Sequence, residues 1–492
     1  MKVLLINPNS SLIDNSWAYK KFFTPIPPLG LAYIASVMEK KGISVSIVDQ
    51  FASKITDAEL LGLIKTTDPD LIGFSALTPV MPDVKRLVPA IRGISKKSKI
   101  VLGNIHGTCF PEEVLKDGTA DIVVRGEGEE TIMELCSHLS RGEGLNGIPG
   151  ISFKSDGQII HNVDRGLIGD LDSLPLPAWH LFDLDDYTRH PLVGIKNARA
   201  FPILASRGCS YRCYYCSQDK VYSKSRYRKL DKVVDEIEYF HGNFNISFFG
   251  FCDAYFPFDE KSGLEFCSLM IKRGLHKKIK WVTETRVDKV TRRLLEAMKE
   301  SGAHLIMYGI EVGNEEVLKS INKGTTLEQA RIALKETRKA GILSQGLFML
   351  GLPEDTEDSC RDTINFAKEI NPDLVKFNVA TPYPGSRFFE DFIKEKTVSR
   401  PETLTSWADW TVSSGDLFYI PKGIDSDTLR YLQRMAMLSF YIRPKIILKH
   451  LIKRTVGYKN IFYGGLWLVT LFYRGIIKKI WNSVFLRMGM AK

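Results

Sequence analysis

Hydrophobic residues in the first third of the chain gather in short runs that alternate with amphipathic stretches. The runs are rich in β-branched residues, and the stretches between them repeat apolar positions at helical spacing. This alternation predicts an α/β fold, with a parallel sheet covered by helices on both faces and ligands bound beyond the carboxyl ends of its strands. The expected strands are residues 3–7, 45–49, 71–76, 100–104 and 121–125, and clear helical patterns occupy 29–41, 82–96 and 129–140.

A second alternation begins near residue 200, after a proline-containing polar segment that is expected to be a linker on the surface. Six strand patterns separated by helical patterns predict a partial (β/α)6 barrel rather than a full barrel of eight units. The expected strands are 201–207, 246–251, 280–285, 305–311, 345–350 and 375–381. The expected divisions are a Rossmann-like domain at 1–145, the linker at 146–200, the barrel at 201–400 and a helical, basic region at 401–492.

Composition agrees with a globular protein and places the positive charge at one end. Of the 492 residues, 44% are hydrophobic and 25% charged, which excludes a disordered or collagen-like chain. The formal net charge is +10, yet the 65 residues after Asp427 hold 13 Lys or Arg and no acidic residue. The first strand is not followed by G-x-G-x-x-G, which argues against a dinucleotide site. The question raised by the charge is therefore what the basic tail contacts.

Three of the eight cysteines, Cys209, Cys213 and Cys216, lie within eight residues directly after an expected strand. Soft thiolates suit zinc or an iron–sulfur cluster, but no fourth Cys or His stands nearby at the spacing of a closed zinc site. A cluster held by three cysteines leaves one iron open for another ligand. The alternative is three thiols close together without a metal. The other five cysteines are scattered and are expected to be small buried side chains, which argues against a second cluster.

The spacing C-x-x-x-C-x-aromatic-C, with Tyr215 in the aromatic place, resembles the signature of radical S-adenosylmethionine enzymes. Segments 251–256, 281–286, 309–313, 323–325, 351–356 and 381–386 resemble later motifs of the same family. The resemblance implies that S-adenosylmethionine binds the open iron and is cleaved by an electron from the cluster to a 5′-deoxyadenosyl radical. Acids and arginines at the strand ends of a barrel point into the mouth of the site. The residues expected to bind S-adenosylmethionine are Tyr215, Asp253, Glu284, Arg286 and Glu311.

Segments 27–33, 103–106 and 126–129 resemble the cobalamin-binding domain that is joined to many radical enzymes. The D-x-H-x-x-G motif, whose histidine binds cobalt in other proteins, is absent, so the resemblance implies a lower cobalamin face without a protein imidazole. His106 is expected to line the pocket of the nucleotide tail, and a structural histidine is the alternative. The residues expected to bind cobalamin are Asn9, Ser75, Thr78, Gly103, His106, Gly126 and Glu127.

The basic C-terminal region mixes lysines and arginines with apolar and aromatic residues. Its uncharged run, residues 460–473, is shorter than the ~20 residues that a membrane-spanning helix needs. Basic flanks and aromatic residues favour a helix in the membrane interface, so residues 443–492 are expected to contact a membrane peripherally. A packed helical cap is the main alternative, and contact with RNA is a weaker one. The first residues lack the pattern of a signal peptide, so a cytoplasmic location at the inner face of the membrane is expected.

Together the motifs predict a cobalamin-dependent radical S-adenosylmethionine C-methyltransferase with a 4Fe–4S cluster. The resemblance implies methyl transfer from methylcobalamin to an unactivated carbon, with a flavodoxin or ferredoxin as reducing partner. The basic, apolar tail suggests a lipophilic substrate such as a hopanoid or another isoprenoid. No nucleic-acid partner is expected. One alternative is an oxidative cyclase like the anaerobic magnesium-protoporphyrin monomethyl ester cyclase. Another is a non-catalytic cobalamin-binding sensor, which would not need the cysteine loop.

Overall fold

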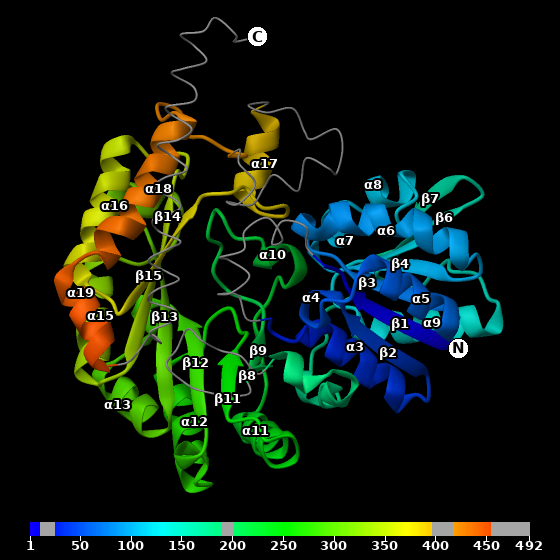
Figure 1. Cartoon of the computed structure of the whole chain (residues 1–492), viewed down its shortest axis with the longest axis horizontal. Helices are drawn as coiled ribbons and strands as arrows, with labels where there is room; N and C mark the ends of the chain where they lie inside the picture. The colour runs from blue at the N-terminus through cyan, green and yellow to red at the C-terminus, as the bar shows by residue number, and fades with distance from the viewer. Residues whose placement is uncertain (10–24, 188–199, 396–416, 454–492) are drawn as a thin grey trace, which may run out of the picture.

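The chain forms two α/β halves that lie side by side, shown in blue to cyan and in green to yellow in Figure 1. The structure is a computed structural model, and it describes residues 1–9, 25–187, 200–395 and 417–453. Each half is built on its own main sheet, one of seven strands and one of six. The expected fold class, a Rossmann-like domain followed by a partial barrel, is confirmed.

The N-terminal sheet has the strand order β2-β1-β3-β4-β5-β6-β7. Its first five strands are parallel, and the chain switches sides between β1 and β3, which is where open sheets of this kind bind ligands. The expected strands are confirmed to within one or two residues. The strands are β1 (Lys2–Asn7), β2 (Ser44–Asp49), β3 (Leu71–Ser75), β4 (Lys99–Gly103), β5 (Ile122–Val124), β6 (Ile151–Ser155) and β7 (Gln158–His161).

Helices cover both faces of this sheet, as the continuous hydrophobic runs of its strands require. Leu4 and Ile6 of β1 pack toward α5, α6 and α8, whereas Val3 and Leu5 pack toward α3 and α9. The helices are α3 (Leu29–Lys40), α4 (Gln50–Ser53), α5 (Asp57–Thr67), α6 (Met81–Ile94), α7 (Ile105–Cys109), α8 (Pro111–Lys116) and α9 (Glu129–Arg141). The patterns near 29–41, 82–96 and 129–140 therefore form helices as expected.

The expected linker at 146–200 is wrong for its first part, because β6 and β7 form an antiparallel hairpin that extends the sheet. Asp156 and Gly157 make the turn with φ of 49° and 80°, the left-handed conformation that an Asp-Gly turn adopts. The remainder of the described segment carries only short 3-10 turns, namely Leu171–Ser173, Trp179–Leu181 and Leu184–Tyr187.

The second half contains six parallel strands in the order β15-β14-β13-β12-β11-β8, the sequential order of a partial (β/α)6 barrel. The strands are β8 (Ala200–Ile203), β11 (Phe248–Phe251), β12 (Lys280–Thr285), β13 (Ala303–Glu311), β14 (Leu343–Leu350) and β15 (Leu374–Val379). The helices around them are α11 (Leu230–Phe244), α12 (Glu260–Lys272), α13 (Arg292–Glu300), α14 (Glu315–Ser320), α15 (Leu327–Lys339) and α16 (Glu357–Ile370).

One expected strand of this half is divided. The run 201–207 forms β8 and then a separate strand, β9 (Ser206–Arg207), which pairs antiparallel with β10 (Arg226–Tyr227) in a small sheet of its own. The chain thus leaves the barrel sheet before it reaches the cysteines.

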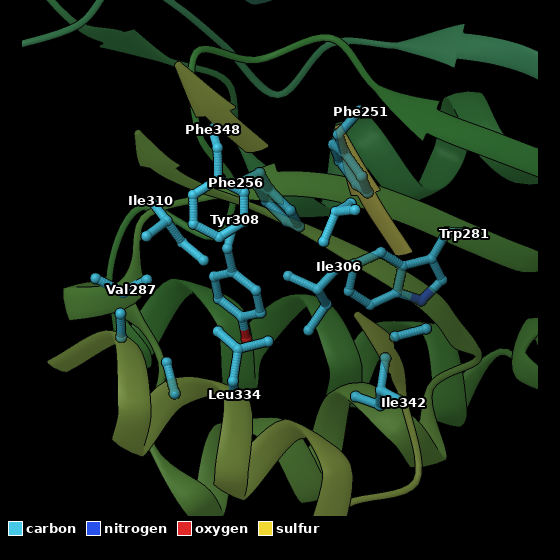
Figure 2. Packing of buried hydrophobic residues seen from close by; sticks show 14 of the residues in the cluster. Phe251, Phe256, Trp281, Val287, Ile306, Tyr308, Ile310, Leu334, Ile342 and Phe348 are labelled. Atoms are coloured by element: carbon cyan, nitrogen blue, oxygen red, sulfur yellow. The ribbon is translucent and has the colours of Figure 1, made fainter. Parts of the chain in front are cut away.

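Large apolar side chains fill the space between the barrel strands and their helices (Figure 2). Phe251 and Phe256 stack with ring centroids 3.9 Å apart, and Trp281 packs edge-on against Phe251. The buried Tyr308 hydroxyl lies 2.7 Å from Thr337 Oγ1 on α15. Side chains alternate along each strand, so the residues next to these buried aromatic residues on the same strand face the inside of the half-barrel.

Helices α17 (Arg387–Lys394), α18 (Ser426–Tyr441) and α19 (Pro444–Lys453) follow the last strand. Helix α18 lies along β15, where the Tyr441 hydroxyl donates to the Val375 carbonyl at 2.9 Å. Within the described ranges, no helix is both long and apolar enough to cross a membrane. The run 460–473 lies outside the described residues.

Candidate cofactor-binding site

The three clustered cysteines lie in a loop, residues 208–225, whose two stems are β9 and β10; we call it the cluster loop. Arg207 on β9 pairs across the stem with Arg226 on β10. Gly208 opens the loop with φ of 92°, and a Cβ there would collide with the carbonyl oxygen of Lys224. Only glycine fits this close approach of the two stems. The short helix α10 (Gln218–Val221) closes the loop.

Cys209, Cys213 and Cys216 are free, half-buried thiols. Burial raises the pKa of Cys216 to about 11 and raises that of Cys213, which the positive charge of Lys323 opposes. No three His, Cys, Asp or Glu side chains in the described part of the chain are arranged to hold a metal ion. A 4Fe–4S cluster makes a different demand, because each thiolate binds its own iron at a separate corner. Three soft donors on one loop, with no disulfide among them, fit such a cluster.

Asp253 is bound by groups of the chain itself. Its buried carboxylate accepts hydrogen bonds from the Ala205 amide at 3.1 Å and from Ser206 Oγ at 2.5 Å. Burial raises its pKa to about 7, although these hydrogen bonds favour the charged form. Through these hydrogen bonds, Asp253 fixes the position of β9, the first stem of the cluster loop, relative to the end of β11.

Arg286 lies directly against the cluster loop. Its guanidinium carbon is 3.6 Å from the centroid of the Tyr211 ring, and Nη1 donates to the Lys323 carbonyl at 2.9 Å. Asp288 pairs with Nε at 2.9 Å. The strand end thus brings a buried positive charge to the cysteines, as the sequence predicts.

Lys323 joins two of the expected residues. Its buried ammonium donates to Glu311 Oε1 at 2.6 Å and to the Tyr215 hydroxyl at 3.1 Å. Glu311 adopts φ of 71°, a strained conformation for a residue with a side chain, and such strain gathers at functional sites. A side chain on Gly309 would meet both Glu311 and Lys323. The sequence placed Lys323 in a motif but did not indicate this partnership.

Glu284 faces the inside of the half-barrel, because its neighbours Thr283 and Thr285 are buried on the helix side of β12. Glu284 is exposed at the barrel mouth. Desolvation by the surrounding half-barrel and the charge of Glu311 raise its pKa, while Lys323 and Lys376 lower it. The structure therefore brings Tyr215, Glu284 and Glu311 into one electrostatic environment beside the cluster loop.

A cavity of about 410 Å³ opens between the two halves. Ser75, Gly103, Gly126 and Glu127, four of the residues expected to bind cobalamin, line it at the carboxyl ends of β3, β4 and β5. The opposite wall belongs to the second half and includes Arg207, Ser217, Gln218, Val221 and Tyr222. Figure 1 shows α10 beside α7 at this boundary. One side of the cavity is therefore built by the cluster loop itself.

Asn9, Thr78 and His106 do not line this cavity. His106 is fully buried, with Nδ1 3.2 Å from Thr78 Oγ1 and its ring 5.1 Å from Phe110. Burial lowers the pKa of His106 to about 3, so the imidazole stays neutral. The Asn9 amide donates to Gln50 Oε1 at 3.2 Å. The burial of His106 and its contacts with Thr78 and Phe110 favour the alternative, a structural histidine.

Comparison with known families and solved structures agrees with this geometry. The B12 binding domain matches residues 19–136, and the Radical SAM superfamily matches residues 203–367. The uncharacterized methyltransferase PH0819 of Pyrococcus horikoshii is 32% identical, over 94% of this chain and 99% of its own length. The anaerobic magnesium-protoporphyrin IX monomethyl ester cyclase of Rubrivivax gelatinosus is 31% identical, over 80% of this chain and 70% of its own.

Two solved structures share the fold. The cobalamin-dependent S-adenosylmethionine radical enzyme OxsB, with aqua-cobalamin bound, superposes with a TM-score of 0.72 at 19% identity, over 99% of this chain and 76% of its own. The methyltransferase TsrM from Kitasatospora setae, with cobalamin and a [4Fe-4S] cluster bound, gives 0.66 at 18%, over 80% of this chain and 75% of its own.

These matches confirm the expected cofactors, which are a 4Fe–4S cluster, S-adenosylmethionine and cobalamin, and they identify an enzyme rather than a sensor. A cysteine loop at a barrel mouth, a cavity between that loop and a B12 binding domain, and a relative aligned over nearly the full length all agree. The chain belongs to the cobalamin-dependent radical S-adenosylmethionine enzymes, a family that includes methyltransferases.

Proposed function

We propose that this enzyme transfers a methyl group to an unactivated carbon of its substrate. The observation that carries the proposal is the cavity between the halves, since the cluster loop forms one of its walls. When bound, the cluster supplies the electron that cleaves S-adenosylmethionine, and cobalamin supplies the methyl group. The chain's task is to hold these groups in one space and to exclude water from it.

The cluster loop holds the iron through Cys209, Cys213 and Cys216. Binding requires deprotonated thiolates, which the buried cations Lys323 and Arg286 favour, against the desolvation that raises the pKa of Cys213. We assign the S-adenosylmethionine pocket to the barrel mouth above these residues. The 1–145 domain then extends by its hairpin to residue 161 and forms the cobalamin half, and the barrel at 201–400 forms the radical half.

Glu284 and Glu311 are the acceptors for the amine and hydroxyl groups of S-adenosylmethionine. Carboxylates accept such hydrogen bonds strongly when they are ionised. The ion pair with Lys323 holds Glu311 in place. Arg286 binds the carboxylate of the ligand or, through its contact with Tyr211, keeps the loop in position.

The test uses the full chain, reconstituted anaerobically with iron, sulfide and cobalamin. It is incubated with a reduced flavodoxin as electron donor, a cell lipid extract and S-adenosylmethionine that carries a deuterated methyl group. We expect 5′-deoxyadenosine, S-adenosylhomocysteine and a product heavier by one labelled methyl group. Replacement of Glu311 by Gln, which preserves the shape of the side chain, should reduce 5′-deoxyadenosine formation by about tenfold or more, the equivalent of one lost charged hydrogen bond.

The replacement of all three cysteines by alanine is the control, and it should abolish 5′-deoxyadenosine. Equal formation of 5′-deoxyadenosine by this variant would overturn the proposal. The second candidate is an oxidative cyclase, which the cyclase relative from Rubrivivax gelatinosus favours. A product that has lost hydrogen and carries no label would establish the cyclase instead.

We propose a lipophilic substrate for the same reaction. A hopanoid C-3 methylase of Methylococcus capsulatus is 26% identical over 78% of this chain and 71% of its own length. Ile442, Ile447 and Leu448 are exposed at the end of α18 and on α19, next to basic residues. Such a surface suits peripheral contact with an anionic membrane. A flavodoxin or ferredoxin is the proposed electron donor.

A further inference from the structure

One buried carboxylate of the cobalamin half contacts both stems of the cluster loop. Glu127 Oε1 accepts from Arg207 Nη1 at 2.9 Å, and Oε2 accepts from Arg226 Nη1 at 2.7 Å. Arg207 ends β9 and Arg226 begins β10, so the two residues enclose the loop and pair with each other across the stem. A single side chain of one half therefore holds both ends of the loop of the other half.

The surroundings of Glu127 make this contact specific. The side chain of Glu127 is 3% exposed, that of Arg207 7% and that of Arg226 10%. Glu129 pairs with Arg207 as well, and two acids thus balance two arginines. Nε and Nη2 of Arg226 have no hydrogen-bond partner in the described part of the chain. Glu127 is therefore the acid that compensates Arg226.

Buried charges that lose their partner are costly, whereas intact buried pairs add little net stability. The value of such a network lies in fixing geometry. Glu127 was expected to bind cobalamin, but the Ile168 amide donates to Oε2 at 2.8 Å in addition to the two arginines. Both oxygens are thus engaged by the chain itself, although the residue lines the cavity.

We propose that Glu127 is a positioning residue that couples cluster binding to cobalamin binding. The inference rests on the proposed function of the cavity as the cobalamin site. Iron bound by the cysteines orders the cluster loop, and Ser217, Gln218, Val221 and Tyr222 of that loop wall the cavity. The ion pairs of Arg207 and Arg226 with Glu127 fix this wall relative to the opposite wall of the cavity, which includes Gly126 and Glu129. Cluster binding therefore prepares the cavity, and by linkage cobalamin stabilises the cluster.

The experiment measures the Kd of hydroxocobalamin for the full chain under anaerobic conditions, with the cluster reconstituted and in the variant with the three cysteines replaced by alanine. We expect the wild-type chain to bind at least about fivefold more tightly with its cluster, the lower end of usual coupling. In Glu127→Gln, the ratio of the Kd without the cluster to the Kd with the cluster should be close to one. Glu127→Asp keeps the charge but cannot reach both stems, so it should reduce the ratio with less risk to folding.

Glu236→Gln is the matched control. Glu236 is also buried and paired with an arginine, Arg228, but it lies on α11 within the barrel half and does not line the cavity. Its ratio should equal that of the wild-type chain even if the variant is less stable. If the role of Glu127 is purely structural, Glu127→Gln should, like Glu236→Gln, change the melting temperature and leave the ratio of the two Kd values unchanged.

A wild-type ratio near one, or an unchanged ratio in Glu127→Gln or Glu127→Asp, would overturn the coupling while cobalamin binding itself stands. A wild-type chain that binds no hydroxocobalamin in either form would overturn the proposed function of the cavity and the coupling together.

Discussion

A single glycine decides whether the cluster loop can close. Gly208 combines a left-handed φ with a direct approach to the Lys224 carbonyl, two conditions that no other residue satisfies together. The collision is with backbone, so a neighbouring side chain cannot move to relieve it. Glycine next to the first cysteine is thus a steric requirement as much as a part of the motif.

Gly208→Ala should lose the cluster while the fold persists. The left-handed backbone alone costs an alanine about 1–2 kcal/mol, and the collision adds to this. We expect the iron and sulfide content of the reconstituted variant to fall to near that of the triple-cysteine variant. Gly62→Ala is the control, because its added methyl group meets open space on α5. Full iron content in Gly208→Ala would contradict the steric explanation.

His106 should make the protein sensitive to acid. Its pKa is about 3 in the folded chain and 6.5 in the unfolded chain, so below pH 6.5 the unfolded state binds a proton that the folded state does not. The free energy of unfolding should therefore fall as pH falls, by up to about 1.4 kcal/mol per pH unit from this residue. His106→Gln should be less stable at neutral pH but show a shallower fall, measured by melting temperature against pH. Parallel profiles for the two proteins would contradict the assignment.

The sequence allowed the chemistry of individual residues to be predicted where the signal was local. The cysteine spacing and the acids at strand ends are contiguous motifs, and the structure gathers Tyr215, Glu284 and Glu311 as expected. The sequence could not indicate the ion pair between Arg207 and Glu127, because these residues lie 80 positions apart in different halves. Nor could spacing distinguish Asp253 from Glu284, since burial of the former depends on how β9 leaves the sheet.

At the scale of elements, the alternation of hydrophobic runs with amphipathic stretches predicted the parallel strands correctly but did not predict the hairpin of β6 and β7. The strands of both main sheets have buried, continuous runs that stand out from the amphipathic helices between them. Strands β6 and β7 are short and belong to a segment with prolines at 149, 175, 177 and 191, so the whole segment resembled a linker. The Asp156-Gly157 turn was the available signal.

Gly157→Ala should weaken this hairpin. The turn holds Gly157 at φ of 80° with no atom near the position of a Cβ, so the penalty is backbone strain alone, about 1–2 kcal/mol. We expect a melting temperature lower by a few degrees, about 2–4 °C per kcal/mol for a large domain. Gly169→Ala, where the backbone is not left-handed and space is also open, should leave it unchanged. Equal melting of both variants would argue that the hairpin contributes little to the stability of the sheet.

At the scale of the whole molecule, the basic C-terminal region raises a question of location. Ile446 and His450 of α19 are buried against the barrel half, so a truncation before this helix would disturb the fold. Removal of residues 454–492 leaves every described helix intact. We expect the full chain to float with anionic vesicles and the truncated chain to float much less.

Salt should reduce the flotation of the full chain, because attraction between basic residues and anionic lipid is screened. Vesicles of neutral lipid provide the control and should recover little of either protein. Equal recovery of the full and truncated chains with anionic vesicles would show that residues 454–492 do not contribute to membrane contact. Failure of both chains to float would remove the main argument for a lipophilic substrate.

The cluster loop is flanked by two strands of only two residues each, and these strands belong to neither large sheet. Oxidative loss of iron should accordingly affect one loop outside the two main sheets while both hydrophobic cores survive. An air-damaged molecule would then stay compact, available for repeated cycles of repair by fresh iron and sulfide instead of being degraded.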